Sequence, residues 1–94
     1  MILDGKYIIV YKKDVDMILS ILYSLGYKFY RGENYNATED ITKCPKEKYY
    51  ICSNNEYLDW WVYTENLLNL EYEEMSTKHL LREYKLKRIL NSNE

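Results

Sequence analysis

Hydrophobic and polar positions along this chain follow two different spacings, and each change of spacing predicts a new structural element. Lys6–Lys12 is a short run of β-branched and aromatic residues with apolar side chains on both faces, which predicts a central strand. Apolar residues then recur at helical spacing over Val15–Leu25, so we predict a helix that packs one stripe on a core. Asp14 is expected to cap the start of this helix, and Gly26 to end it in a left-handed conformation.

The region after this helix divides into a short apolar run and a long polar one. Tyr27–Arg31 predicts a second strand, and the short connections are expected to place it beside or near the first strand, with the helix covering one face of the sheet. Residues 32–48 show no periodicity and are interrupted by glycine, asparagine and proline, so we predict a long polar surface loop. The alternative is a binding loop that presents Tyr35 and Ile41.

Two further runs predict a hairpin. Tyr49–Ser53 and Tyr57–Thr64 both have the composition of strands, and Asn54-Asn55 between them is a turn signal. Successive side chains of a strand point to opposite faces, so one of the two adjacent tryptophans must face inwards. We expect Trp60 in the core and Trp61 on the outer face, together with the residues that alternate with it.

The C-terminal part of the chain predicts one more helix. Glu65–Glu74 fits either a short helix or a covering loop, and Ser76 is a good N-cap for a final helix. Leu80, Leu81 and Tyr84 would form its packing face, and residues 91–94 are expected to fray. The sequence therefore predicts a single α+β domain over residues 1–94, in the order β-α-β-β-β-α. About four strands would form a mostly antiparallel sheet, with one helix packed on a face and a C-terminal helix.

Composition narrows the classes of protein to which the chain can belong. Hydrophobic residues at 47% and aromatic residues at 16% exclude intrinsic disorder, and 30% charged residues exclude a membrane protein. Residue types with AT-rich codons, such as lysine, asparagine, isoleucine and tyrosine, are abundant, which indicates an AT-rich bacterial or phage genome. The N-terminal residues do not resemble a signal peptide, so we expect a cytoplasmic protein, in the host cytoplasm if a phage encodes it. Cys44 and Cys52 are then expected to be reduced thiols.

Charge is distributed unevenly along the chain. Residues 1–48 hold eight basic and seven acidic side chains, residues 49–74 hold six acidic and no basic ones, and residues 75–94 hold five basic and two acidic ones. The formal net charge of −2 therefore conceals an acidic segment and a basic C-terminal part. The acidic segment also contains both tryptophans, so large apolar area and negative charge occur together there.

Candidate catalytic and metal-binding residues are few. His79 has no partner at a motif spacing, and we expect an ordinary surface or packing role for it. Cys52, inside an apolar strand, is expected to be a small buried residue, whereas Cys44 beside Pro45 is expected to be exposed and modifiable. Two cysteines and one distant histidine do not fill a zinc site, and the sequence has no glycine-rich phosphate loop. We therefore predict no catalytic residue, no metal and no cofactor.

The acidic aromatic segment favours a protein-binding function. Exposed tryptophan and tyrosine side chains provide anchor area, and surrounding carboxylates favour a basic partner surface such as that of a host nuclease or defence protein. We predict a non-enzymatic inhibitor or modulator encoded by a phage or another mobile element, of the anti-CRISPR or another anti-defence kind. The predicted partner-binding residues are Tyr57, Asp59, Trp61, Tyr63, Glu65, Glu71, Glu73 and Glu74.

Other functions would use other features of the chain. Nucleic-acid binding would use the basic residues of the last helix, which are Lys78, Arg82, Lys85, Lys87 and Arg88. Five charges are a small electrostatic footprint on an acidic protein, so this alternative ranks second. A tyrosine-lined pocket would instead bind a small ligand, and association of two copies as a homodimer also stays open. The simplest alternative is that the aromatic residues are core and the carboxylates form a solvated rim.

Overall fold

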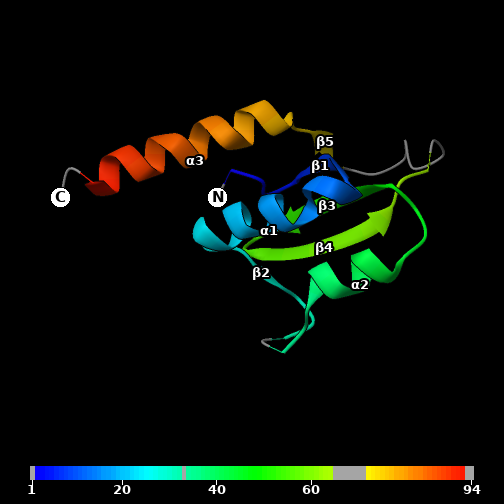
Figure 1. Cartoon of the computed structure of the whole chain (residues 1–94). Helices are drawn as coiled ribbons and strands as arrows, with labels where there is room; N and C mark the ends of the chain where they lie inside the picture. The colour runs from blue at the N-terminus through cyan, green and yellow to red at the C-terminus, as the bar shows by residue number, and fades with distance from the viewer. Residues whose placement is uncertain (1, 33, 65–71, 93–94) are drawn as a thin grey trace.

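The computed structural model describes residues 2–32, 34–64 and 72–92, and it confirms an α+β fold (Figure 1). Within these residues, five strands form one mixed sheet: β1 (Lys6–Tyr11), β2 (Lys28–Phe29), β3 (Lys48–Asn54), β4 (Tyr57–Val62) and β5 (Glu73–Glu74). Three α-helices accompany the sheet: α1 (Val15–Ser24), α2 (Ala37–Lys43) and α3 (Thr77–Ser92). None of the described helices is both long enough and apolar enough to cross a membrane.

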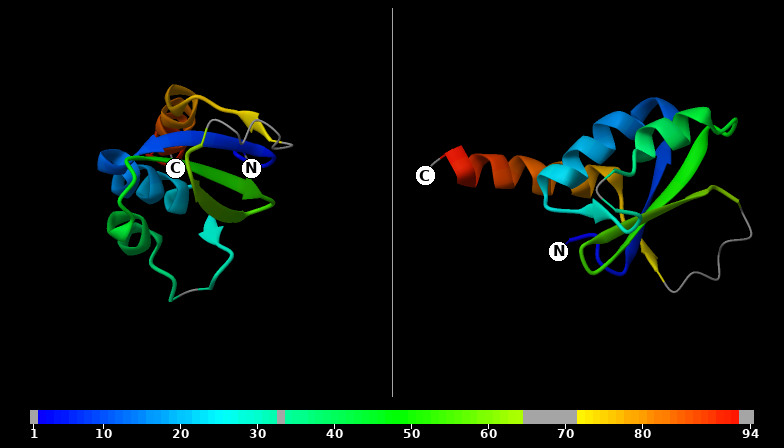
Figure 2. Two further views of the ribbon diagram at one scale, coloured as in Figure 1. Left: turned by 90° about the vertical axis from the view of Figure 1, so that its right-hand side faces the viewer. Right: turned by 90° about the horizontal axis from the view of Figure 1, so that it is seen from below.

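The strand order is β2-β4-β3-β1-β5, so the hairpin strand β3 lies at the centre of the sheet (Figure 2). The long pairs β1–β3 and β3–β4 are antiparallel, whereas the two-residue strands β2 and β5 pair parallel with β4 and β1. The expectation that the strands before and after α1 lie beside or near each other is wrong, because β3 and β4 separate them. The β3–β4 hairpin pairs locally and β3 then pairs with β1, which leaves β2 only the outer edge of β4.

Helix α1 forms where the sequence predicts it. Its buried side chains are Val15, Ile18, Leu19, Ile21 and Leu22. Gly26 ends the helix at φ +97°, and the amide nitrogen of Tyr27 donates to the carbonyl oxygen of Leu22 at 3.0 Å, which is the left-handed ending expected for glycine. The predicted cap is wrong, because the Asp14 side chain makes no capping hydrogen bond. Asp14 is the last residue of a 3-10 turn, η1 (Lys12–Asp14), and its ψ of −3° is not the extended backbone of a capping residue.

The prediction of a loop over residues 32–48 is wrong at its centre, where α2 forms. Asn36 has an extended backbone, and its Oδ1 accepts a hydrogen bond from the amide nitrogen of Glu39 at 3.0 Å, which caps the helix. Ala37 and Ile41, one helical turn apart, are completely buried, so the alternative of a binding loop that presents Ile41 is wrong as well. Lys43 and Glu39 form an ion pair of 2.8 Å on the exposed side. The buried stripe has only two residues, which is too short a pattern to indicate a helix.

Helix α3 begins as predicted. The amide nitrogen of His79 donates to Oγ of Ser76 at 3.1 Å, so Ser76 caps the helix. Leu80 is buried in the same core as α1, and Leu81 and Tyr84 pack against that core. The first half of α3 is therefore held by the expected packing face.

The second half of α3 projects beyond the rest of the fold (Figures 1 and 2). Leu86 and Leu90 are exposed there. The helix continues to Ser92, since lysine, arginine and leucine are good helix formers, and fraying of residues 91–94 stays a prediction. Residues 93–94 lie outside the described part of the chain.

The two faces of the sheet differ in what covers them. Helices α1 and α2 cover one face, which we call the helix face (Figure 2). Its buried strand residues are Ile8, Val10, Tyr49, Ile51 and Leu58. The opposite face, which we call the outer face, is turned away from α1 and α2 and carries Tyr7, Ile9, Tyr11, Lys48, Tyr50, Cys52, Tyr57, Asp59 and Trp61.

The alternation predicted for β4 is confirmed. Trp60 packs against the core on the helix face, and its Nε1 donates to the hydroxyl oxygen of Tyr35 at 2.6 Å. The ring centroid of Tyr49 lies 5.8 Å from that of Trp60 in an edge-on arrangement. Trp61 points to the outer face, where 38% of it is exposed. One tryptophan is thus structural and the other is accessible.

Candidate functional site

Exposed aromatic side chains gather on the outer face. Tyr11, Tyr57 and Trp61 come from the strands themselves, and Tyr30, directly after β2, packs edge-on against Tyr57 with 6.4 Å between ring centroids. Tyr23 on α1 is the exposed aromatic residue elsewhere in the described chain. A group of large apolar side chains on one uncovered face is a typical feature of an interaction surface. The outer face is therefore the candidate functional site.

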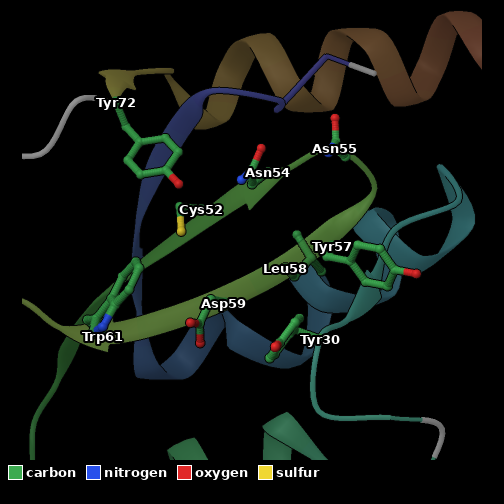
Figure 3. A pocket seen from close by; sticks show the side chains of 9 residues that line it. All are labelled: Tyr30, Cys52, Asn54, Asn55, Tyr57, Leu58, Asp59, Trp61 and Tyr72. Carbon is green, nitrogen blue, oxygen red and sulfur yellow. The ribbon is translucent and has the colours of Figure 1, made fainter.

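A hollow of about 350 Å³ lies within this face (Figure 3). Cys52, which is buried, and Asp59 are direct partners in the β3–β4 register and both line it. Aromatic side chains surround them, and these are Tyr30, Tyr57, Trp61 and Tyr72. The β3–β4 turn adds two amide side chains, Asn54 and Asn55. We call this site the aromatic hollow, and it combines apolar walls with one carboxylate.

The carboxylate of Asp59 is held in place by the backbone. Its Oδ1 accepts a hydrogen bond from the amide nitrogen of Trp60 at 2.9 Å. No described lysine, arginine or histidine forms an ion pair with Asp59. Asp59 is therefore a partly exposed carboxylate to which a cationic ligand could bind.

Two lysines share the outer face, which the segment-by-segment charge pattern does not reveal. The Nζ atom of Lys48 lies 4.0 Å from the ring centroid of Tyr63. The Nζ atom of Lys28 lies 5.3 Å from the ring centroid of Tyr57 and 3.6 Å from a carboxylate oxygen of Glu56. Each lysine is engaged with an aromatic ring of this chain. The face is thus not uniformly acidic.

Tyr50 is buried on the outer face because other aromatic rings enclose it. The ring centroids of Tyr7 and Tyr63 lie 5.3 and 5.1 Å from that of Tyr50. The Tyr50 hydroxyl donates to the carbonyl oxygen of Thr64 at 2.9 Å. Burial, and then the neighbouring Tyr63 hydroxyl, raise the pKa of Tyr50. Tyr7, Tyr50 and Tyr63 therefore form a supporting cluster next to the aromatic hollow.

The two cysteines are free thiols with opposite pKa shifts. Burial, assisted by the Asp59 charge, raises the pKa of the Cys52 thiol to about 11, so this residue is the buried, neutral side chain that the sequence predicts. Cys44, at the end of α2, is partly exposed, and a hydrogen bond from Tyr49 lowers the pKa of its thiol. No group of three histidine, cysteine or acidic residues within the described ranges could hold a metal ion.

The structure separates the carboxylates that the sequence places in one segment. Glu74 pairs with Tyr7 in the β1–β5 register and faces outwards, whereas Glu73 pairs with Lys6 and faces the other way. Burial, and then the Glu74 charge, raise the pKa of the Tyr7 hydroxyl. Glu65 and Glu71 lie outside the described residues. Of the predicted partner-binding residues, those that the structure brings together on the outer face are Tyr57, Asp59, Trp61, Tyr63 and Glu74.

The basic residues predicted for nucleic-acid binding lie along α3 and are all exposed: Lys78, Arg82, Lys85, Lys87 and Arg88. Two of them have partners within the chain. The Nζ atom of Lys87 donates to the carbonyl oxygen of Ser24 at 2.8 Å, and the guanidinium of Arg88 lies 5.7 Å from the ring centroid of Tyr84. His79, also exposed, lies 3.8 Å from Glu83, which agrees with a surface role.

Sequence reasoning found one side of the aromatic hollow and missed the other. The alternation in β4 identifies Tyr57, Asp59 and Trp61, but Tyr30 and Tyr72 reach the site through the pairings of β2 and β5, for which the sequence carries no local signal. Comparison with protein-family models, curated proteins and solved structures finds no match to this chain. The functional assignment therefore rests on the geometry of the chain itself.

Proposed function

We propose that this chain is a non-enzymatic protein-binding module whose contact surface is the outer face of the sheet. The observation that carries the proposal is the exposure of Tyr30, Tyr57 and Trp61 around one hollow. Aromatic residues dominate the energetics of protein interfaces because they bury a large area and lose little rotamer entropy. Two of these residues, Tyr57 and Trp61, lie on a strand supported by a packed core, and Tyr30 directly follows another, which gives the surface a defined shape before binding.

The partner that we propose is a protein with a basic surface. Asp59 has no cation among the described residues and Glu74 lies on the same face, whereas Lys28 and Lys48 are engaged with tyrosine rings. A net charge of −2 further favours association with a positively charged protein. Host nucleases and defence proteins have such surfaces. An inhibitor from a phage or another mobile element, anti-CRISPR-like or anti-defence in another way, is the role that we propose.

The test compares three immobilised forms of the chain in captures from bacterial lysate. The unmodified chain should retain a basic partner, and Trp61→Ala combined with Asp59→Lys should retain at least about tenfold less, because both an anchor and a charge are lost. Lys78→Glu combined with Arg82→Glu, on α3, is the control and should retain as much as the unmodified chain. Equal retention by the outer-face variant, once circular dichroism shows that it is folded, would contradict the proposal.

Nucleic-acid binding through α3 is a second candidate, favoured by the exposure of all five of its basic residues. Fluorescence anisotropy with DNA and RNA would then show binding that weakens with salt and disappears in the Lys78→Glu, Arg82→Glu variant. If the unmodified chain binds neither nucleic acid, this candidate is excluded. A small ligand in the aromatic hollow would instead raise the melting temperature of the unmodified chain in a metabolite panel.

A further inference from the structure

We infer that the aromatic hollow is a binding site for an arginine side chain of the protein partner. This inference rests on the proposed function, because it names the group of the partner that the outer face would hold. Figure 3 shows the arrangement, in which Trp61 and Tyr72 lie on either side of Cys52, and Asp59 lies between Trp61 and Tyr30. Aromatic rings beside a carboxylate attract a cation through the ring quadrupole and the formal charge together.

Trp61 is the ring on which the inference depends most. Indole attracts cations more strongly than phenol or benzene, and 38% of Trp61 is exposed. The chain places its own cations over tyrosine rings, with Lys28 over Tyr57 and Lys48 over Tyr63. No described cation lies over Trp61. The strongest cation-binding ring on this face is therefore accessible to a cation from outside.

Asp59 supplies the negative charge that attracts the guanidinium and an oriented acceptor for its N–H groups. The hydrogen bond from the amide nitrogen of Trp60, at 2.9 Å, engages Oδ1 and restricts the rotation of the carboxylate. The second oxygen, Oδ2, can accept a hydrogen bond from a ligand in the hollow. Beside Asp59, on the neighbouring strand, Cys52 is a buried neutral thiol that neither repels nor competes for the guest. A single oriented carboxylate is thus placed among apolar walls.

Arginine fits this site better than lysine does. A guanidinium group is planar and weakly hydrated, so it can stack on the Trp61 ring while its N–H groups donate to Asp59. The side-chain amides of Asn54 and Asn55 line the other end of the same hollow, away from Trp61. A lysine ammonium is more strongly hydrated and has no plane to stack.

The first experiment uses two probes of the same shape and different charge. N-acetyl-arginine amide and N-acetyl-citrulline amide are titrated into the unmodified chain, and the indole N–H signals are followed by NMR. The arginine probe should shift the Trp61 signal saturably and bind at least about fivefold more tightly than the citrulline probe. The Trp60 signal is an internal control, since its N–H is bonded to Tyr35 on the other face. Equal affinity of the two probes, or no saturable shift, overturns the inference.

The second experiment uses matched variants. Asp59→Asn should weaken binding of the arginine probe about fivefold, and Trp61→Leu, which keeps an apolar side chain, should weaken it about threefold to tenfold. Glu74→Gln removes the same charge from the same face outside the hollow, and should change the affinity less than about twofold. A loss in Glu74→Gln as large as that in Asp59→Asn would mean that net charge rather than the hollow attracts the probe, and would overturn the inference.

A second copy of the chain is the other candidate occupant, because Arg82 and Arg88 are exposed on α3. Analytical ultracentrifugation would then show a concentration-dependent dimer. If Asp59→Asn abolishes this dimer, and Arg82→Gln combined with Arg88→Gln abolishes it too, the guest is an arginine of a second copy, and the inference of a foreign partner is overturned.

The two proposals can fail separately. If the Trp61→Ala, Asp59→Lys variant loses its captured partner but the unmodified chain does not bind the arginine probe, the outer face binds proteins by other contacts. In that case the arginine inference fails and the proposed function stands. If the probe binds as expected but capture is unchanged in this variant, the proposed function fails instead.

Discussion

Ile51 and Tyr50 are neighbours on β3 and face opposite sides of the sheet. Ile51 is completely buried beneath the helices, in a core of aliphatic side chains that also includes aromatic ones such as Tyr49 and Phe29. Tyr50 is also buried, but its cover consists of other tyrosines, and its hydroxyl is bonded to a backbone carbonyl. On the helix face, burial depends on tertiary packing by separate elements. On the outer face, burial depends on aromatic rings that pack against one another. Trp61, on the same face, is not covered in this way and stays exposed.

This difference indicates which part of the molecule stability requires. The helix face is closed, and no described buried side chain with a polar atom lacks a hydrogen-bond partner there or elsewhere. The outer face carries exposed aromatic rings with a hollow between them. Folding stability does not require these rings to be exposed. Large rings kept at a surface cost solubility, and we propose that this chain keeps them for binding. Four predictions test this contrast between the two faces.

The largest effect is expected on the helix face. Ile51→Ala should lower the free energy of unfolding by about 2–5 kcal/mol, because it removes a completely buried side chain and leaves a cavity. Urea unfolding followed by circular dichroism measures the change. A loss below about 1 kcal/mol would show that neighbouring side chains move in to fill the cavity. The helix face would then not be a rigid support for the outer face.

A second prediction concerns α2, which covers part of the helix face. Asn36→Ala should cost about 1 kcal/mol of unfolding free energy, since it removes the hydrogen bond to the Glu39 amide. Asp14→Ala is the matched control, because Asp14 occupies a cap position without a capping bond, and its cost should stay below about 0.5 kcal/mol. Equal costs in the two variants would argue against this assignment of the caps.

The third prediction uses pH to test burial on the outer face. The pKa of the Cys52 thiol is raised from its ordinary value of 9.0 to about 11, so between these values the unfolded chain loses a proton that the folded chain keeps. Stability is therefore complete below pH 9 and falls as the pH rises towards 11, by about 1 kcal/mol at pH 10 from this thiol. The raised pKa of Tyr50 acts in the same direction.

The Cys52→Ala variant measures how much of this pH dependence of stability comes from the Cys52 thiol. The decrease in unfolding free energy between pH 8 and pH 10 should be smaller in this variant by about 1 kcal/mol. An identical pH dependence in the variant and the unmodified chain would mean that Cys52 is open to water, and that the floor of the hollow is not closed.

The smallest effect is expected at the centre of the candidate site. Trp61→Leu should lower the free energy of unfolding by less than about 1 kcal/mol, because 38% of Trp61 is already exposed and leucine keeps an apolar side chain there. The same variant should bind the arginine probe about threefold to tenfold more weakly. A stability loss above about 2 kcal/mol would place Trp61 in the core, as the simplest alternative from the sequence supposes, and would remove the contrast between the faces.

Elements with local signals were predictable from the sequence. Helix α1 has a long apolar stripe and a glycine at its end, α3 has a serine cap, and the β3–β4 hairpin has an asparagine turn, in which Asn55 adopts φ +57°. Helix α2 was not predictable in this way, because Ala37 and Ile41 are its only buried residues and its cap lies within a polar stretch. The position of β2 depends on pairing with a strand far along the chain, which periodicity does not encode.

The same division applies to the candidate site. Strand alternation predicted that Asp59 and Trp61 share a face, because that relation is local to β4. Other residues reach the outer face through the registers of three separate strands. Lys28 and Tyr30 lie on or directly after β2, Lys48 lies on β3, and Tyr72 lies directly before β5. Residues 49–74 hold only acidic charges in the sequence, but in the structure Lys28 and Lys48 from outside this segment lie on the same face and offset part of its negative charge.

The bond between Asp59 and the Trp60 amide has a further effect on how the protein behaves at high concentration. Strand β2 pairs only with Tyr57 and Leu58, so within the described residues the rest of β4 has no strand along its outer edge. The amide of Trp60 points to that edge, because the amides that alternate with it, such as that of Tyr63, donate to β3. If a strand of another molecule paired with β4 at this edge, the Trp60 amide would not be available as a donor, because it is bonded to Asp59, and the carboxylate would place a negative charge there. Asp59 thus also disfavours edge-to-edge polymerisation into fibrils.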